Sequence, residues 1–485
     1  MNLVQSLAST LIILTLPCQV HSAQHVIVIG GGPTPVESQA SIELNTKWII
    51  DLTRQSNPDA KLHILYTDGN APDVDVHKQG SKPKQRELYE PLARVYGKEQ
   101  ENDYHFYSSN IAKDIMMADK KHVTETLRKV FSNLKSHDKL FLVYQGHGGY
   151  HKNDTNGNFL RLWKNTKITV TELESLMRMA SPSSTIRYIF PQCFSGAFSR
   201  LIYKNAAFKN GLAKGTRCGF LAQNEHHSSE GCTPSVETET YRDYSSYFFS
   251  ALSGKSISGQ IIDENPDYNH DGKVTLWEAH QYSITNAFSV DHSLSTSEAY
   301  LEDWQPWHLR WLPYTPNTRS TYEDIVQRVA ARFNIQSNNV NILREAANRI
   351  STITSRIEKK RYSLDILDKS IKMLQNNIKQ KLLMIWPQLR HPYTREYIKT
   401  TSSNIKKIQQ KISSHSDYLE LIDKQKKYHS LAMQTLNLKR ELAQMRKIFR
   451  MRRMNKLLEK FNRYASEEKK SEYKQLQNCE HSTLE

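Results

Sequence analysis

A histidine and a cysteine occupy corresponding places in two similar stretches of this sequence. His147 follows the apolar run Lys139-Leu-Phe-Leu-Val-Tyr-Gln-Gly and precedes two glycines, and Cys193 ends the run Ile186-Arg-Tyr-Ile-Phe-Pro-Gln. Each run has the length of a strand and gives way to turn residues. Neighbouring parallel strands would bring the imidazole and the thiol together at the carboxyl edge of a sheet, where open α/β sheets carry their sites.

The chemistry open to such a pair is nucleophilic catalysis. A thiol attacks as its thiolate, and an imidazole can take the thiol proton and later return a proton to a leaving amine. Gly148 would let the backbone approach a substrate, so that the amides of Gly148 and Cys193 stabilise an oxyanion. The order of residues is similar to the caspase signature, which has its histidine about 50 residues before a Gln-containing cysteine segment. The alternative is a buried structural cysteine and an unrelated surface histidine.

Strand and helix patterns alternate around this pair. We expect strands at 25–29, 61–67 and 218–223 besides the two above, helices at 36–55, 120–134, 169–179 and up to about 204, a hairpin across 153–167 and a long polar excursion at 68–110. Thr171 and Glu174 are three residues apart, as in a capping box. The alternation predicts an α/β fold whose mostly parallel sheet is covered by helices on both faces.

Charge divides the 485-residue chain into two parts. Residues 321–485 carry 34 Lys and Arg against 17 Asp and Glu, whereas residues 1–320 carry 32 against 33. An anionic partner is therefore expected on the last third, if anywhere. Nucleic acid is not expected, because the basic runs Arg446 to Arg453 and Lys456 to Lys460 read more simply as the solvated face of a helix. Nucleotide binding at Gly30-Gly-Gly is not expected either, since the G-x-G-x-x-G spacing is missing.

The first 22 residues are typical of a secretory signal peptide. An apolar run from Leu3 to Leu16 precedes small residues around a cut after Ser22, and the run is shorter than the ~20 residues of a membrane span. The mature chain is therefore expected to be exported, to the medium, a periplasm or an acidic organelle. In an oxidising compartment Cys218 and Cys232 could close a small loop, which would leave Cys479 unpaired; free buried thiols are the alternative.

A calcium loop of the EF-hand type is predicted at 267–278. The residues match D-x-[DN]-x-[DN]-G-x5-E at every defined position, with Gly272 making the turn. A helix should follow from Trp277 to Phe288. A single loop of this kind in an exported protein is expected to fix structure. The expected oxygen ligands of Ca²⁺ come from Asp267, Asn269, Asp271, the Lys273 carbonyl, Thr275 and Glu278.

The last third is expected to form long helices. Apolar residues recur in heptad steps from Leu343 to Ile385, Trp386-Pro interrupts them, and the pattern resumes near Thr394 and continues to Phe449. Two long helices around a proline-marked turn predict an antiparallel hairpin, an all-α, coiled-coil-like domain at 321–485. Residues 316–320 would be its linker to a first domain at 23–315. The hairpin must bury its seams against itself, the first domain or another copy.

The first domain resembles the legumain family of cysteine peptidases, in the wider caspase-like group. Four stretches carry the resemblance, beginning at Val143, Tyr188, Asn224 and Tyr241: Val-Tyr-Gln-Gly-His-Gly-Gly, Tyr-Ile-Phe-Pro-Gln-Cys-Phe-Ser-Gly, Asn-Glu-His-His-Ser-Ser-Glu-Gly-Cys and Tyr-Arg-Asp-Tyr. The resemblance implies a caspase-like α/β/α sandwich, a dyad of His147 and Cys193, and Gly148 in the oxyanion hole.

The resemblance also implies a substrate pocket walled by Ser229 and Asp243. The family's pocket glutamate is replaced by Pro191, and its Arg-His pair aligns with Glu37 and Ser38. Loss of the family's arginine at Glu37 and the retained Asp243 would make the pocket more acidic, which predicts a preference for a basic residue before the cut.

Together these patterns predict an exported, calcium-binding cysteine endopeptidase that acts on protein or peptide substrates. A transpeptidase using the same acyl-enzyme and a non-catalytic scaffold displaying the coiled coil are the alternatives. The helical domain would serve either as an autoinhibitory cap of a proenzyme or as an arm for self-association or docking.

Overall fold

The computed structural model describes residues 22–80, 84–98, 103–231, 235–311, 320–335, 339–392 and 394–484. The predicted signal peptide lies outside the described residues except for Ser22, and most of the predicted linker and Cys232 also lie outside them. In the part of the chain that is described, no helix is long and apolar enough to cross a membrane.

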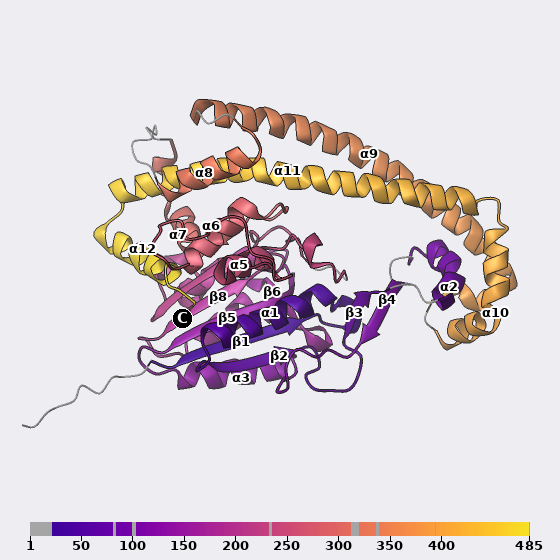
Figure 1. Cartoon of the computed structure of the whole chain (residues 1–485), viewed down its shortest axis with the longest axis horizontal. Coiled ribbons are helices and arrows are strands. Elements are labelled where there is room, and N and C mark those ends of the chain that lie inside the picture. Colours follow the sequence, from indigo (N-terminus) through magenta and orange to yellow (C-terminus); the bar gives the residue numbers. More distant parts are fainter. Residues whose placement is uncertain are drawn as a thin grey trace, which may run out of the picture.

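A mostly parallel sheet forms the centre of the molecule (Figure 1). Its main strand order is β10-β9-β8-β5-β1-β2; along this order β10 runs antiparallel to β9, and the other neighbours are parallel. This arrangement confirms the predicted sheet. The strands are β1 (Gln24–Gly31), β2 (Lys61–Tyr66), β5 (Lys139–Gly149), β8 (Thr185–Phe190), β9 (Thr216–Leu221) and β10 (Leu294–Ser295).

Two cores cover the two faces of the sheet. Val26 and Val28 of β1 point into one core and Ile27 and Ile29 into the other, as the two-residue period of a strand requires. Both faces are apolar because parallel strands are covered on both sides. The first face is covered by α1 (Ala40–Ser56), α5 (Tyr244–Ser253) and α6 (Leu276–Asn286), and the second by α3 (Lys120–Asn133) and α4 (Val170–Met177).

The last third of the chain is helical and includes an antiparallel hairpin, as predicted. The helix α9 (Asn339–Ile385) packs along α11 (Tyr418–Tyr464), and both extend beyond the sheet (Figure 1). The second long helix was predicted as one element, but Ser414 to Asp417 separates α10 (Arg395–Ser413) from α11. At the far end of the hairpin, α2 (Lys84–Val95) from the excursion packs on α10 in a separate core.

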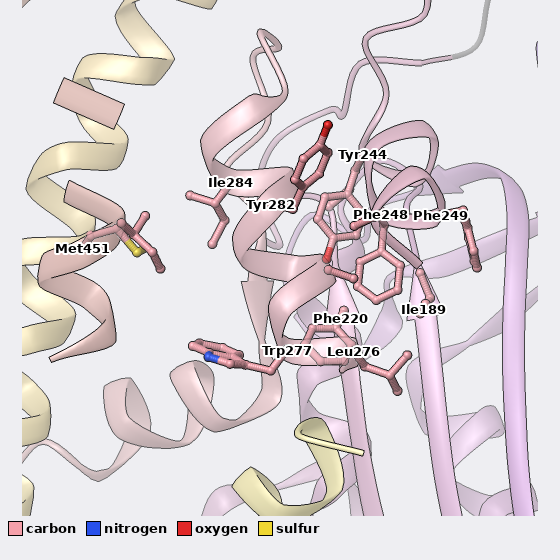
Figure 2. Packing of buried hydrophobic residues seen from close by; sticks show 14 of the residues in the cluster. Ile189, Phe220, Tyr244, Phe248, Phe249, Leu276, Trp277, Tyr282, Ile284 and Met451 are labelled. Carbon is pink, nitrogen blue, oxygen red and sulfur yellow. The ribbon is translucent and has the colours of Figure 1, made fainter. Parts of the chain in front are cut away.

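The helical region does not have a core of its own next to the sheet. The first core continues from the sheet and α6 into α8 (Thr321–Arg332), α11 and α12 (Glu467–Glu480). Figure 2 shows Met451 of α11 facing Ile284 of α6, with Phe220 of β9 further into the same cluster. The buried core therefore crosses the predicted boundary at 316–320, and part of the hairpin seam is buried against the first domain.

A disulfide ties the end of the chain to the sheet. Cys218 of β9 is bonded to Cys479 of α12, so the predicted Cys218–Cys232 pairing is wrong. Spacing in the sequence favoured the near partner, whereas the fold brings the distant α12 against β9. The carbonyl of Leu484 accepts hydrogen bonds from Arg187 (3.3 Å) and Gln24 (2.8 Å), near the amino ends of β8 and β1. The chain thus ends at the edge of the sheet opposite to Cys193.

Several predicted elements differ in detail. The first helix begins at Ala40, because Pro35 starts a short 3-10 turn before it. The capping box of α4 is formed by Thr169 and Glu172 instead of Thr171 and Glu174. The predicted helix after Cys193 is a 3-10 segment, Ser195–Ile202. The excursion contains a two-stranded ribbon, β3 (Val76–Gln79) and β4 (Tyr104–Tyr107), besides α2.

Candidate active site

The register of β5 and β8 sets His147 and Cys193 at the same level. Val143 pairs with Ile189 in the parallel ladder. His147 and Cys193 each lie four residues beyond that pair. The sequence predicted that the strand gives way to a turn at His147, but β5 runs through His147 and the two glycines after it. It continues to Gly149 and pairs with β6 (Phe159–Leu162) of the predicted hairpin, which fixes the backbone at His147 opposite Arg161.

Gly148 lies directly against the backbone of Cys193. A Cβ atom at Gly148 would be 2.0 Å from the carbonyl oxygen of Cys193 and 2.7 Å from Cγ of Gln192. No side chain fits in that space. The structure therefore brings the residue after the histidine into contact with the cysteine segment.

The imidazole of His147 is oriented from the other side by the segment that follows β1. Its Nε2 lies 2.7 Å from the carbonyl oxygen of Glu37 and 3.0 Å from Oε1 of Gln39. A carbonyl only accepts, so Nε2 carries the proton and Nδ1 keeps its lone pair. Burial lowers the pKa of His147, and the contact with the Glu37 carbonyl offsets part of this effect. The ring is thus held in the neutral form that a general base requires.

Cys193 lies at a sharp turn and is half-buried. The next residue, Phe194, has φ 60° and ψ 20°, a left-handed conformation that is uncommon for a residue with a side chain. The Sγ atom is 3.7 Å from Oγ of Ser229 and 3.8 Å from its carbonyl oxygen. Ser229 is itself held by a hydrogen bond from its hydroxyl to the carbonyl of Pro191, at 3.0 Å.

A narrow pocket opens beside Cys193. Its volume is about 20 Å³, room for one water-sized group, so a longer side chain must move its walls to enter. The predicted pocket residues Ser229 and Asp243 both line it, together with Asn45 of α1, Gln145 and Glu230. The Oε1 atom of Gln145 is buried without a hydrogen-bond partner.

The carboxylate of Asp243 has a structural task as well. It caps α5 by accepting from the Ser246 amide (2.9 Å), and it also accepts from the hydroxyls of Ser245 (2.5 Å) and Ser246 (2.7 Å) and from Nδ2 of Asn45 (3.1 Å). Asp243 is therefore both a helix cap and a pocket wall, and much of its hydrogen-bonding capacity is already used.

Comparisons with known proteins do not identify a family. No protein-family model matches the chain, and no curated protein matches it. A secreted C11 cysteine protease from Bacteroides thetaiotaomicron, solved with an irreversible peptide inhibitor, is similar with a TM-score of 0.23 and 15% identity, over 66% of this chain and 80% of that one. A Geobacter sulfurreducens protein solved by structural genomics has a TM-score of 0.33 and 11% identity, over 56% and 93% of the two chains. These values are too low to carry an argument, and the resemblance to legumains is not confirmed by them.

Glu37 was predicted as a substrate-binding residue, and the structure places it on the His147 side of the candidate site. It is not among the residues that line the pocket beside Cys193. Its carboxylate forms a bidentate pair with Arg161, at 2.5 and 3.1 Å, and its carbonyl orients His147. Alignment with the family's Arg-His pair suggested that the Glu37 side chain binds substrate. In the structure, the short 3-10 turn at Pro35–Glu37 presents the Glu37 backbone to the imidazole. Sequence patterns do not reveal such a backbone acceptor.

The predicted calcium loop has the expected turn. Gly272 has φ +83°, and the carboxylate of Asp267 accepts from the amides of Asp271 (3.1 Å) and Gly272 (2.9 Å). Glu278 opens α6 in a capping box with Thr275 and also accepts from the amides of Tyr268 and Asn269. Among the described residues, no group of three or more His, Cys, Asp or Glu side chains is gathered as a metal site. The donor types fit Ca²⁺, and its binding stays a prediction.

Proposed function

We propose that this chain is a cysteine endopeptidase in which Cys193 is the nucleophile and His147 is the general base and acid. The observation that carries the proposal is the contact between the segments of the two residues: Gly148, next to the histidine, touches the carbonyl of Cys193 at the carboxyl edge of parallel strands. Thiol acyl transfer needs a nucleophile and a general base, and the half-buried Cys193 at a sharp turn and the oriented imidazole of His147 fit these two roles.

The reaction would begin with transfer of the thiol proton to Nδ1 of His147 as Sγ attacks the peptide carbonyl. The resulting oxyanion would be stabilised by the amides of Gly148 and Cys193. His147 then gives the proton to the leaving amine, which breaks the C–N bond and leaves a thioester on Cys193. Water, deprotonated by the same imidazole, hydrolyses the thioester and restores the thiol.

The pocket beside Cys193 supports a preference for a basic side chain before the cut. Acceptor oxygens on its lining residues include the unpartnered Oε1 of Gln145 and the carboxylate of Asp243. Lys and Arg donate hydrogen bonds and carry positive charge, so they match such a lining better than acidic or apolar side chains do.

The disulfide supports export. Disulfides form and persist in oxidising compartments, and the Cys218–Cys479 bond joins two buried elements. Among the described residues, Cys193 is the cysteine that forms no disulfide. Calcium at 267–278 belongs to the same proposal, because extracellular modules use such loops at high ambient calcium.

Incubation of the mature chain and its Cys193→Ala variant with a mixed peptide library tests the proposal. Mass spectrometry should find fragments from the wild-type chain alone, with Lys or Arg enriched before the cuts. Cleavage by both chains, or by neither across pH 4 to 8, would remove the peptidase assignment. Enrichment of Asn before the cut would leave the peptidase and overturn the basic preference.

A further inference from the structure

One face of α11 contacts the pocket residue Glu230 and the end of α6 with the segment that follows it. Arg440, Gln444, Lys447 and Arg450 follow each other at intervals of four, three and three residues, so they lie on the same side of the helix. The basic stretch 446–453 was interpreted as a solvated face, but Lys447 is buried and Arg450 is largely covered. Part of this charge therefore serves contacts inside the molecule.

Three of these side chains hydrogen-bond the end of α6 and the segment that follows it. Lys447 donates through Nζ to the carbonyls of Ile284 (3.0 Å) and Ala287 (3.1 Å), and Gln444 donates to the carbonyl of Ser289 (3.0 Å). Arg450 donates to the carbonyl of Ser293 (2.8 Å). These bonds satisfy backbone acceptors that would otherwise be buried without partners.

That segment in turn holds Glu230. The amide of Glu230 donates to Oδ1 of Asp291 (2.8 Å), and the amide of Val290 donates to Oε2 of Glu230 (3.1 Å). The remaining oxygen, Oε1, accepts from Nε of Arg440 at 2.8 Å and from its Nη2. The two charged side chains are only 15% and 14% exposed, so the pair is largely shielded from solvent.

Glu230 follows Ser229, the residue whose hydroxyl and carbonyl contact Sγ of Cys193, and both residues line the pocket. All described residues that line this pocket precede residue 246. The helical region therefore supports the Ser229–Glu230 wall of the pocket without entering the pocket. The end of the chain lies at the opposite edge of the sheet, bound to Arg187.

We propose that Arg440 is a positioning residue for the active site: by holding Glu230 it fixes the Ser229 wall of the pocket against Cys193. The helical C-terminal region is then a required part of the enzyme and not a removable cap. This inference rests on the proposed peptidase function for its kinetic consequence, but the restraint on the loop can be measured without it.

Three variants of the full-length mature chain test the proposal. Arg440→Ala removes the pair, Arg440→Lys keeps a charge, and Arg453→Ala is the control, because Arg453 lies on the same helix with a 59% exposed side chain and a 3.9 Å contact to Glu302. For peptides with Arg before the cut, we expect kcat/KM to fall at least tenfold in Arg440→Ala, mainly through KM. Partial recovery is expected in Arg440→Lys and no change in the control.

Hydrogen exchange separates positioning from general stability. Amides of residues 224–231 should exchange at least threefold faster in Arg440→Ala than in the wild type, with no change in the β5 and β8 amides. Unchanged exchange and kinetics would overturn the proposal. Faster cleavage by Arg440→Ala would overturn it too, because the ion pair would then hold the narrow pocket shut. If the wild-type chain cleaves nothing, the proposed function fails, and the exchange result still decides whether Arg440 holds this loop.

Discussion

The guanidinium of Arg440 hydrogen-bonds the carboxylate of Glu230, although 210 residues separate them in the chain. Glu230 is next to Ser229, which contacts Cys193, the proposed nucleophile. The helix α11 is thus connected to the proposed substrate pocket through Glu230 and Ser229, which both line it. This relationship links the two halves of the sequence, whose charge and composition differ, into one site.

The pH dependence of cleavage should report the buried state of His147. Burial lowers the pKa of this imidazole below its ordinary value of 6.5. The base acts when it is neutral, and a lowered pKa keeps it neutral to lower pH, so kcat/KM should fall only below pH 6.5. A profile of kcat/KM from pH 4 to 8 measures this. An acid limb with its midpoint above 6.5 would contradict the orientation of His147 described above.

Gly148→Ala should impair catalysis more than folding. The added Cβ would lie 2.0 Å from the Cys193 carbonyl oxygen, so the two backbones must separate and the oxyanion donors lose their places. Loss of an oxyanion donor typically costs 10²–10³ in kcat. We expect a fall of about that size or more, measured with a peptide substrate, together with a lower Tm than the wild type, because the added Cβ meets backbone atoms of Cys193. Full activity in a folded variant would show that Gly148 is not beside the reacting carbonyl.

Cys479→Ser should destabilise the chain, because it opens a loop that spans 261 residues. Loss of a native disulfide typically costs about 2–5 kcal/mol. Chemical denaturation should therefore show a lower free energy of unfolding for this variant. Cys193→Ser serves as the matched control, since Cys193 forms no disulfide and its substitution should change stability little. Equal stability of the two variants would argue against the disulfide.

Much of the sheet could be predicted from the sequence, because buried parallel strands give short, nearly continuous apolar runs. The β1, β5, β8 and β9 strands follow from that pattern, and so does the placement of His147 and Cys193 near the carboxyl ends of β5 and β8. Distant pairings could not be predicted. Cys218 has a near candidate in sequence, yet its partner is Cys479, because α12 packs against β9 only in the folded chain.

The helical region shows the same limit. Its heptads predicted long helices, and Ile378 and Met445 are buried as expected. Phe449 lies in step with them but is 37% exposed, while Lys447 is buried against carbonyls. Periodicity predicts which side of a helix is apolar on average. It does not predict where another part of the fold, such as the end of α6 next to Lys447, will bury a polar side chain.

Calcium should raise the thermal stability of the wild-type chain. Binding to the folded loop alone would stabilise it by about 2.7 kcal/mol at a concentration 100-fold above the Kd. We expect a higher Tm in calcium than in chelator, and Asp271→Ala should abolish the difference because Asp271 is one of the predicted ligands. Asp263→Ala, just outside the loop, is the control. An equal Tm of the wild type in calcium and in chelator would remove the predicted calcium site.

The central claim is that His147 activates Cys193, and the alkylation rate of Cys193 tests it most directly. A peptidyl chloromethyl ketone with Arg before the reactive carbon should label Cys193 rapidly at pH 7, well below the ordinary thiol pKa of about 8.5. In His147→Ala the alkylation rate at pH 7 should fall at least tenfold. The midpoint of the pH profile of that rate should move toward about 8.5. Identical rate profiles for the two folded proteins would contradict the dyad.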